Sequence, residues 1–390
     1  MKKICRLCIL ILFVLTSCKN ENVENHTISD KIEQCINAYI TKWDYKPALE
    51  VSVYGKKGKE KYNYKGGYFS VSNKTHLNDD NTFILYSITK SMTATVIIDL
   101  VNQEKLSLNN TIEDFFQDLN RIYINNDATI EELLTHRSGI QDYTDNPALI
   151  YNNPFLKNED WDPIKILDYI KIPADDRGKF IYSSANYILL GMIIEKVTGQ
   201  KLYDYFQEKL FIPCGITLSL YPQEGIDIEK IVHPHVYPNT FMGLYGDGNT
   251  PIDITNQIKN VNELLIKCSW SAGGVVGNAE NTSLWGYELL SVNGCMEASI
   301  NSCILESVSK FSNEMSLSDA YGFGIRKIIY SNYELIGSYG RSIGSENLMF
   351  YNKDKDVCIV ILSSSNTKTD GNPNIDELLF SIFDTIDENE

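Results

Sequence analysis

The sequence predicts an α/β fold of the α+β kind, in which one antiparallel sheet flanked by helices carries an inserted helical domain. Short alternating apolar runs, typical of strands, gather near both ends of the chain, whereas helical patterns dominate its middle. The two groups of strands must pair with each other, because each would otherwise leave open edges. We therefore expect a sheet domain of residues 31–90 and 311–390, and a mainly helical domain of residues 91–310.

The first strands are expected at residues 48–54 and 60–64, on either side of a turn that contains Gly55 and Gly58. Four short strands are expected near the other end, at residues 324–330, 334–337, 347–351 and 357–362. A closing helix follows them, with one apolar face made of Ile375, Leu378, Leu379, Ile382 and Phe383. In the middle of the chain, residues 187–197 predict a buried helix that ends at Gly199.

Ser87 and Lys90 stand three residues apart where an apolar strand runs into a helix. Apolar residues recur behind them at helical spacing, namely Met92, Val96, Ile97, Leu100 and Val101. Positions i and i+3 share one face of a helix, so Lys90 can reach the Ser87 hydroxyl. A serine hydroxyl needs such a neighbour to take its proton, and a helix start favours developing negative charge. The pattern predicts a serine nucleophile with its own base.

The Ser-x-x-Lys spacing alone is weak evidence, since about two matches are expected by chance in a chain of this length. Two others do occur, at Ser307/Lys310 and Ser365/Lys368. Ser365 lies in a polar run typical of a loop, and no strand precedes Ser307. The context therefore favours Ser87.

The first 17 residues predict a signal peptide, with a basic start and an apolar run too short to span a bilayer. Leu15-Thr-Ser-Cys18 resembles a bacterial lipobox, so we expect cleavage before Cys18 and acylation of that cysteine. An ordinary secretory signal with a chance cysteine is the alternative. Residues 18–30, polar and acidic, would form the tether. This predicts an exported, membrane-anchored bacterial lipoprotein, periplasmic or on the cell surface.

The formal net charge is −16, and 43% of the 390 residues are hydrophobic, which is ample for a large core. An acidic surface argues against nucleic acid or an anionic lipid face as a partner. Six cysteines follow Cys18 and show no Cys-x-x-Cys pair. A Cys295–Cys303 disulfide is one reading, although free buried thiols are favoured for most of the six.

Five stretches in this order resemble the serine β-lactamase and penicillin-binding-protein family, in its class C and D-alanyl-D-alanine carboxypeptidase-like branch. They are Phe83 to Leu108, Leu133-Leu-Thr-His-Arg-Ser-Gly-Ile-Gln-Asp-Tyr143, Phe180-Ile-Tyr-Ser-Ser-Ala-Asn-Tyr-Ile-Leu-Leu-Gly191, Trp270-Ser-Ala-Gly-Gly-Val-Val276 and Tyr321-Gly-Phe-Gly324. The resemblance covers about residues 31–385 and implies a β-lactamase/transpeptidase-like fold. It also implies a serine hydrolase that acts through an acyl-enzyme on a small ester, amide or peptide.

The resemblance makes Ser87 the acyl-accepting nucleophile, Lys90 its proton partner and Tyr182 a second base whose phenolate is favoured by nearby cations. The backbone N–H groups of Ser87 and Arg341 would form the oxyanion hole. Ser184, Ser338 and Gly340 would complete the binding site.

Two positions depart from the family pattern. The Asn expected after Tyr-Ser is Ser184, and the third motif, normally Lys or His, a small residue and Gly, reads Ser338-Tyr339-Gly340. Ser338 supplies no positive charge, and Arg341 should point to the opposite face of its strand unless a bulge intervenes. We expect weakened recognition of β-lactams and of D-Ala-D-Ala, and a preference for neutral acyl groups. A D,D-carboxypeptidase or β-lactam-binding protein, and a catalytically silent binding lipoprotein, are the alternatives.

The histidines have plainer interpretations. His136 is expected to be structural, because it lies in a loop before a glycine. His233 and His235 could share a strand face as metal ligands, but no further ligand run accompanies them, so no metal site is predicted. No cofactor is expected, and the oligomeric state is left open.

Overall fold

The computed structural model describes residues 27–388 except 44, 120, 147, 152–160, 223–224, 237–251, 311–318 and 366–373. The predicted signal peptide, Cys18 and most of the predicted tether lie outside the described residues. Among the described helices, none combines the length and the apolar character needed to cross a membrane.

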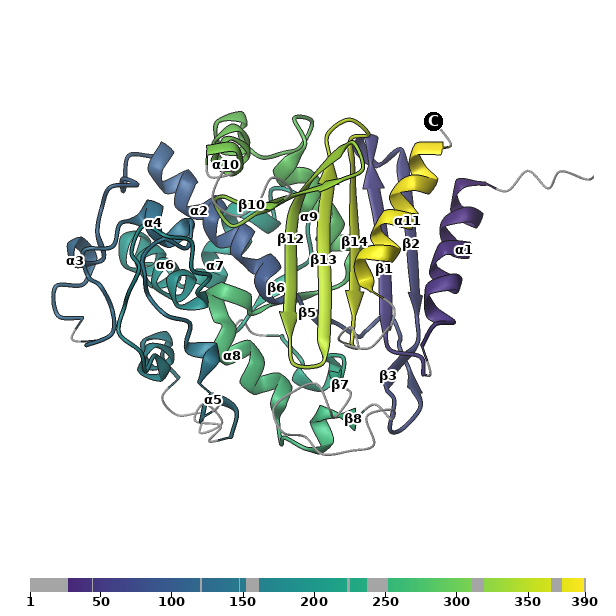
Figure 1. Cartoon of the computed structure of the whole chain (residues 1–390), viewed down its shortest axis with the longest axis horizontal. Coiled ribbons are helices and arrows are strands. Elements are labelled where there is room, and N and C mark those ends of the chain that lie inside the picture. The colour runs from purple at the N-terminus through teal and green to yellow at the C-terminus, as the bar shows by residue number, and fades with distance from the viewer. Residues whose placement is uncertain are drawn as a thin grey trace, which may run out of the picture.

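One antiparallel sheet of seven strands, in the order β10-β11-β12-β13-β14-β1-β2, forms the right-hand half of the view in Figure 1. The strands are β1 (Leu49–Gly55), β2 (Glu60–Gly66), β10 (Asp319–Tyr321), β11 (Arg326–Tyr330), β12 (Tyr333–Ser342), β13 (Ser345–Asn352) and β14 (Val357–Ser363). β1 pairs with β14 along its whole length, with Val51 opposite Ile361. Both ends of the chain therefore build one sheet, and the predicted fold class is confirmed.

The sheet is covered on both faces because alternate residues of its central strands are apolar on either side. Leu348 and Phe350 point toward α1 (Ile28–Ile40) and α11 (Ile375–Glu388), which pack beside each other. Met349 and Tyr351 point the other way, into the core that includes α9 (Ala279–Leu290).

The sequence did not predict α1, whose first residues fall within the expected tether of residues 18–30. The side chain of Thr27 accepts a hydrogen bond from the backbone N–H of Asp30, and the Asp30 carboxylate accepts one from the N–H of Thr27. This capping box starts the helix, and Ile32 and Ile36 anchor its apolar face on the sheet. The tether, if it forms, ends before residue 27.

Besides α9, the α-helices described between the two strand groups are α2 (Thr89–Asn102), α3 (Ile112–Phe115), α4 (Ile130–Leu134), α5 (Ala148–Tyr151), α6 (Ser184–Thr198), α7 (Leu202–Phe206), α8 (Val261–Gly273) and α10 (Ala298–Lys310). α6 ends at Gly199 in the left-handed conformation, as its sequence predicts. α2 is buried almost all round rather than amphipathic, because α6, α8 and α10 pack against it. It also crosses the expected domain boundary at residue 90, so the division into two domains stays a prediction.

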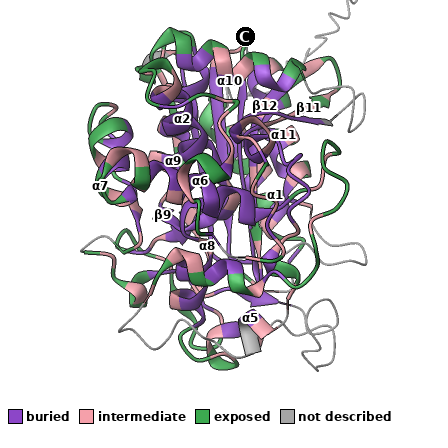
Figure 2. Cartoon of the chain, turned by 90° about the vertical axis from the view of Figure 1, so that its left-hand side faces the viewer, coloured by how far each residue is buried: buried purple, intermediate pink, exposed green. Residues whose placement is uncertain are grey.

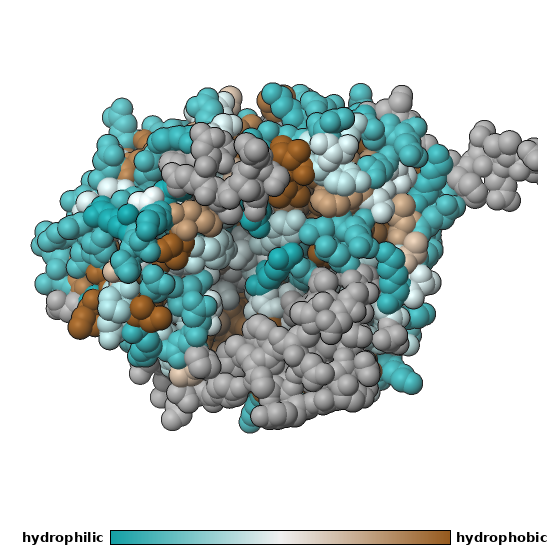
Figure 3. Space-filling model, in the orientation of Figure 1, coloured by the Kyte–Doolittle hydropathy of each residue, from teal (hydrophilic) through white to brown (hydrophobic). Residues whose placement is uncertain are grey.

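Short strands complete the described fold. β5 (Phe83–Ile84), β9 (Val275–Gly277) and β6 (Ser219–Leu220) form one small sheet, while β3 (Tyr68–Ser70) pairs with β4 (Thr75–His76) and β7 (His235–Val236) with β8 (Ile252–Asp253). The middle of the chain is therefore mainly but not wholly helical. The coloured part of the face in Figure 3 is largely hydrophilic.

The Cys295–Cys303 interpretation is wrong. Cys295 is bonded to Cys214, which lies 81 residues earlier in the chain, and Cys303 is a free thiol on α10. Residues 295 and 303 are close in sequence, but a disulfide forms between the cysteines that the tertiary structure brings to bonding distance. Cys268 and Cys358 are buried free thiols, whereas Cys35 and Cys303 are free but only partly buried. The expectation of buried free thiols therefore holds for two of the six cysteines.

Candidate active site

Ser87 lies in a single turn of 3₁₀ helix, Tyr86–Ile88, between β5 and α2. The preceding residue, Tyr86, is buried and has a φ of 48°, a conformation that non-glycine residues seldom adopt. The backbone is held in this conformation by β9, since the N–H of Leu85 donates to the carbonyl of Val275. The turn exposes the Ser87 hydroxyl to a cavity at the start of α2.

Lys90 lies on the first turn of α2 with only 1% of its surface exposed. Its Nζ donates to Ser87 Oγ at 2.9 Å and to the carbonyl oxygen of Ala272 at 2.8 Å. A third, longer contact of 3.4 Å joins it to Ser184 Oγ. The i, i+3 spacing thus places the amine against the hydroxyl, as predicted for a nucleophile and its base.

Tyr182 also contacts the Ser87 hydroxyl. Its hydroxyl donates to Ser87 Oγ at 2.8 Å, and Lys90 Nζ lies 5.1 Å from the centre of its ring. Tyr182 is 39% exposed, so this edge of the site is open to solvent. The three residues predicted to be catalytic are therefore brought together around one oxygen atom.

The loop of residues 136–139 holds the segment that carries Tyr182. The N–H of Ser183 donates to His136 Nδ1 at 3.1 Å, and the N–H of Ile181 donates to the His136 carbonyl at 2.8 Å. Ser138 Oγ donates to the Asn186 side chain at 2.7 Å. These contacts join the second and third of the matched sequence stretches in one part of the site.

His136 is fully buried against the Tyr182 ring, with ring centres 4.2 Å apart. Burial, reinforced by the charge of Lys90, holds the pKa of His136 well below its usual range. A neutral ring whose Nδ1 accepts from Ser183 fits the structural role expected from the sequence.

Strand β12 forms the other wall of the site. β11 pairs only with residues 333–337, so from Ser338 onward β12 is a sheet edge beside the nucleophile turn. Ser338 Oγ donates to the carbonyl of Ser87 at 3.2 Å. At Gly340 a β-carbon would lie 2.1 Å from the Leu85 carbonyl oxygen, so only glycine lets the strand come this close. The oxyanion role of the Ser87 and Arg341 N–H groups stays a prediction.

Arg341 points to the face of β12 opposite Ser338, because the pairing with β13 continues without a bulge. Its guanidinium lies 4.7 Å from the centre of the Tyr339 ring and 2.6 Å from the Glu346 carboxylate. Arg326, on β11, lies over the same ring at 5.1 Å. Two arginines therefore flank Tyr339 at the rim of the site, and Arg326 was not predicted from the sequence.

Two hollows meet at Ser87. One of about 450 Å³ has apolar walls that include Tyr143, Leu149 and Leu265, with Asp142 and Asp145 beside them. The other, of about 320 Å³, lies between the aromatic residues Phe180, Tyr182, Tyr321 and Tyr339 and reaches Arg326 and Ser338. An acyl group and a leaving group can therefore extend to either side of the nucleophile.

The sequence did not predict Asp142 as a site residue. One of its carboxylate oxygens accepts from the N–H of Ser184 at 3.0 Å and the other accepts from the N–H of Thr144 at 3.1 Å. Asp145 lines the same hollow, and burial together with the charge of Asp142 raises its pKa. The signal available was the Gln-Asp-Tyr143 end of the second matched stretch, which the sequence analysis quoted without assigning a role.

The other candidates do not form a second site. Ser307 is buried on α10, where its hydroxyl donates to the Ile304 carbonyl. Ser365 accepts from the Tyr45 hydroxyl, and Lys368 lies outside the described residues.

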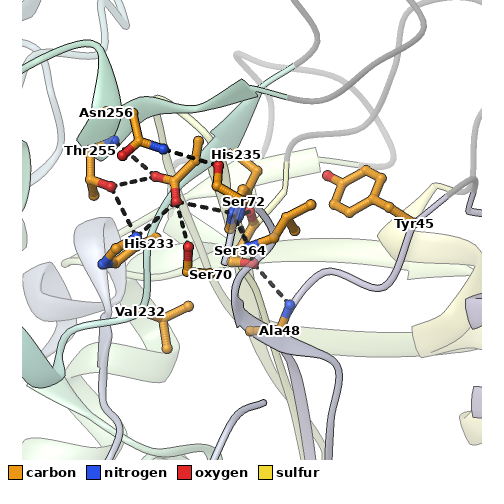
Figure 4. A network of polar contacts seen from close by, with 12 residues as sticks. Tyr45, Ala48, Ser70, Ser72, Val232, His233, His235, Thr255, Asn256 and Ser364 are labelled. Carbon is orange, nitrogen blue, oxygen red and sulfur yellow. Dashed lines mark hydrogen bonds and ion pairs between the residues drawn. The ribbon is translucent and has the colours of Figure 1, made fainter. Parts of the chain in front are cut away.

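His233 Nδ1 lies 2.8 Å from the Asp253 carboxylate, and His235 Nδ1 contacts the Ser364 carbonyl (Figure 4). The N–H of Val71 donates to His235 Nε2, so the lone pair of that nitrogen is already used in a hydrogen bond. Among the described residues, one group has the closeness of metal ligands, namely Cys214, Glu288 and Cys295, and two of its members form the disulfide.

Comparison with protein families gives one match, in which a family model described as Beta-lactamase covers residues 47–381. Curated relatives include the unguisins hydrolase ungD' of Aspergillus campestris, 24% identical over 233 residues (55% of this chain and 39% of that protein). Penicillin-binding protein 4* of Bacillus subtilis is 27% identical over 183 residues (44% and 38%). The chain thus spans less than half the length of these two relatives.

Solved structures show the same fold at low identity. D-amino acid amidase from Ochrobactrum anthropi, complexed with D-phenylalanine, superimposes with a TM-score of 0.76 at 19% identity, over 93% of this chain and all of that one. An octameric penicillin-binding protein homologue from Pyrococcus abyssi gives 0.65 at 20% identity, over 90% of this chain and 76% of that one.

Proposed function

This chain belongs to the beta-lactamase family, and we propose that it is a serine hydrolase that cleaves a small ester, amide or peptide bond through an acyl-enzyme. The observation that carries the proposal is the arrangement around Ser87 Oγ, which lies 2.9 Å from Lys90 Nζ and 2.8 Å from Tyr182 Oη. Two proton-accepting groups within hydrogen-bond distance are what a serine hydroxyl needs to become a nucleophile.

The proposed reaction has two halves. Ser87 Oγ attacks the carbonyl carbon while its proton passes to Lys90 or Tyr182, and the N–H groups of Ser87 and Arg341 hold the oxyanion. The leaving group takes up a proton and departs, which leaves an ester on Ser87. Water then attacks this ester while Lys90 or Tyr182 takes its proton. The acid product is released, and the Ser87 hydroxyl is regenerated.

Amides and peptides are the favoured substrates within this proposal. The structure neighbours include an enzyme titled D-amino acid amidase, and the two hollows leave room for groups on both sides of the scissile bond. Ser338 supplies no positive charge to bind a substrate carboxylate. This favours substrates with a neutral acyl group over β-lactams and D-Ala-D-Ala peptides, which carry a carboxylate. The intact contacts of Ser87, Lys90 and Tyr182 favour an enzyme over a silent binding protein.

We further propose that the protein is exported and anchored by acylated Cys18, which lies outside the described residues. The basic start, the short apolar run and Leu15-Thr-Ser-Cys18 support this. The Cys214–Cys295 disulfide also fits an oxidising compartment. Labelling with an alkyne fatty acid should mark the wild type and not Cys18→Ala; equal labelling of the two would contradict the anchor.

Activity-based probes test the hydrolase. A fluorophosphonate should label the wild type on the peptide that contains Ser87 and should not label Ser87→Ala. Ser307→Ala is the matched control, since it removes the serine of another Ser-x-x-Lys sequence and should keep the label. Labelling by a fluorescent penicillin as well would favour the D,D-peptidase alternative, and labelling by neither probe would favour the silent binding protein.

A further inference from the structure

Helix α8 is broken at Trp270, next to the active site. Trp270 has φ 31° and ψ −118°, far from helical values, although residues on both sides of it belong to the helix. Positive φ is uncommon for a residue with a large side chain and persists only where the surroundings impose it. Here the ring is buried and packs edge-on against Trp161, with centres 5.8 Å apart.

The carbonyls at the end of this helix bind groups outside it. α8 ends at Gly273, so the carbonyls of residues 271 and 272 have no helical N–H groups four residues on. Instead side chains from other elements donate to them: Tyr143 to Cys268 at 2.7 Å, Thr93 to Ser271 at 2.7 Å and Lys90 to Ala272 at 2.8 Å. The carbonyls of residues 271 and 272 therefore face α2, which carries Thr93 and Lys90.

Three acceptors surround Lys90 Nζ. The Ala272 carbonyl belongs to the backbone, so its direction is set by the path of the chain and not by a side-chain rotamer. The other two, on Ser87 and Ser184, are hydroxyl oxygens, and the Ser184 contact of 3.4 Å is long for a hydrogen bond. The family pattern has an Asn at residue 184, whose amide oxygen would reach further than the serine hydroxyl. In this chain the carbonyl is the closest acceptor that holds the flexible lysine on the side away from Ser87.

We propose that the break at Trp270 is a positioning device for Lys90: it turns the Ala272 carbonyl toward Nζ and takes over the support that Ser184 is too short to give. This inference rests on the proposed function only in that Lys90 is taken as the base. Trp270 and Ala272 act through Lys90 and need not touch substrate.

Gly191 on α6 allows the break to be disturbed without changing any residue that contacts Ser87. An added β-carbon there would lie 2.4 Å from Ser271 Oγ, 2.5 Å from Ser271 Cβ and 2.9 Å from the Trp270 ring. Gly191→Ala must therefore push residues 270–271 away from α6. Gly286→Ala on α9 is a matched control, since its β-carbon would lie 2.5 Å from Cys358 Sγ, in the core beneath the sheet.

Kinetics with a neutral aryl ester give the first test. Gly191→Ala should lower kcat about 10- to 100-fold, the range expected for a hydrogen bond to a charged group, and leave KM within about twofold. Gly286→Ala should lower the melting temperature without changing kcat. Adding Ser184→Asn to Gly191→Ala should recover part of kcat, because the amide oxygen offers Lys90 a new acceptor. An unchanged kcat in Gly191→Ala, or no recovery by Ser184→Asn, would overturn the inference.

Thr93→Val covers the case in which Gly191→Ala does not fold. It removes the donor to the Ser271 carbonyl at nearly constant volume, so kcat should fall with KM unchanged. Thr95→Val is its control, because the Thr95 hydroxyl bonds to the Ser91 carbonyl within α2. Equal kcat values in the two variants would count against the positioning role.

Crystal structures separate this inference from the proposed function. If the wild type neither hydrolyses the ester nor reacts with a fluorophosphonate, the proposed function fails. The position of Lys90 can still be compared between wild type and Gly191→Ala. We expect Nζ to leave the Ala272 carbonyl in the variant; a preserved contact near 2.8 Å would show that the break does not hold Lys90.

Discussion

Two buried polar clusters, one around Ser87 and one around Asp253, differ in how completely their polar groups are enclosed. Around Ser87, the buried Lys90 is held by two hydroxyls and one carbonyl, and the cluster opens onto a hollow of about 450 Å³. Around Asp253, both carboxylate oxygens are taken up by neighbours, with Ser70 and His233 on Oδ2 and the N–H of Thr255 on Oδ1. One cluster has room for a further molecule, and the other is closed.

The closed cluster links five segments of the chain, at residues 70–71, 233–235, 253–255, 344 and 364, most of which are drawn in Figure 4. Asp253 Oδ2 accepts from Ser70 Oγ at 2.8 Å and lies 2.8 Å from His233 Nδ1. His235 contacts the carbonyl of Ser364 through Nδ1, and its Nε2 accepts from the N–H of Val71. Its N–H also donates to the carbonyl of Gly344, in the turn that follows β12. Ser70 Oγ donates to the carboxylate, and Ser364 Oγ lies 3.3 Å from His235 Nδ1. His235 Nε2 accepts from Val71 and stands 3.9 Å from Asp253, so no histidine joins a serine to the carboxylate in the order of a catalytic triad.

The comparison teaches that burial of charge does not by itself mark a catalytic site. Both clusters contain groups that are almost wholly buried, Lys90 in one and Asp253 in the other. What distinguishes the first is that its contacts leave Ser87 exposed to a cavity. Mutations should therefore affect activity in the open cluster and stability in the closed one.

The largest expected effect is on turnover. Ser87→Ala should abolish hydrolysis of a neutral aryl ester, and Lys90→Ala should lower kcat/KM about 10³-fold, in the range of general base catalysis. Because the two residues act as one unit, the double variant should be no worse than Ser87→Ala. Steady-state kinetics measure this. Residual activity of Ser87→Ala near the wild-type rate would remove the distinction between the clusters.

The second effect is on stability. Asp253→Ala leaves His233, Ser70 and Thr255 without their acceptor, and breaking a buried polar pair lowers the free energy of unfolding by about 3–5 kcal/mol. kcat per folded molecule should stay close to wild type. Urea unfolding and active-site titration measure the two quantities. A stable variant that has lost activity would show that the closed cluster serves catalysis.

The third effect is a pH dependence of stability. Burial lowers the pKa of His235 to about 4 from an ordinary value of 6.5. The folded state therefore binds the proton less well than the unfolded state. Above about pH 6.5 this histidine does not lower the free energy of unfolding, and as the pH falls toward 4 its protonation in the unfolded state lowers that free energy progressively. The full shift corresponds to about 3 kcal/mol. The pKa of Asp253 is also lowered, so its stabilising contribution to the free energy of unfolding is lost mainly below pH 3.8, its ordinary pKa.

Urea unfolding between pH 7 and pH 4.5 measures this dependence. His235→Gln, whose amide can both accept and donate but does not titrate, should have a shallower slope over that range. A slope equal to that of the wild type would assign the pH dependence to other groups.

The smallest effect concerns substrate charge at the open cluster. Ser338→Lys places an ammonium next to Ser87, and should raise kcat/KM for nitrocefin, which carries a carboxylate, about tenfold relative to a neutral ester. Arg326→Gln tests whether the arginine on the neighbouring strand already supplies part of that charge. If Ser338→Lys helps both substrates equally, position 338 does not select for charge.

The sequence could predict contacts that are local or carried by a motif. Ser87 and Lys90 share one turn, and Tyr182 belongs to a stretch that resembles the family. The pairing of β1 with β14 followed from the need to cover edges. The order of the seven strands and the presence of helix α1 could not be predicted, because both depend on which faces of the sheet are covered by other elements.

Other parts of the site could not be predicted because they depend on packing. The Ala272 carbonyl is backbone and has no residue signature, and its direction depends on the break at Trp270. Arg326 reaches the rim only because β11 pairs with β12 in one register. The bond between Cys214 and Cys295 likewise depends on tertiary packing.

The pairing of β1 with β14 also sets an order of events during biosynthesis. Val51 meets Ile361 only after nearly the whole chain has been made, so the first hairpin leaves one edge without its partner until then. Contacts at such long range form slowly, and the local helical contacts of the middle should form first. A ribosome that stalls before residue 357 would release a chain with an open strand edge, and such chains should aggregate or be degraded.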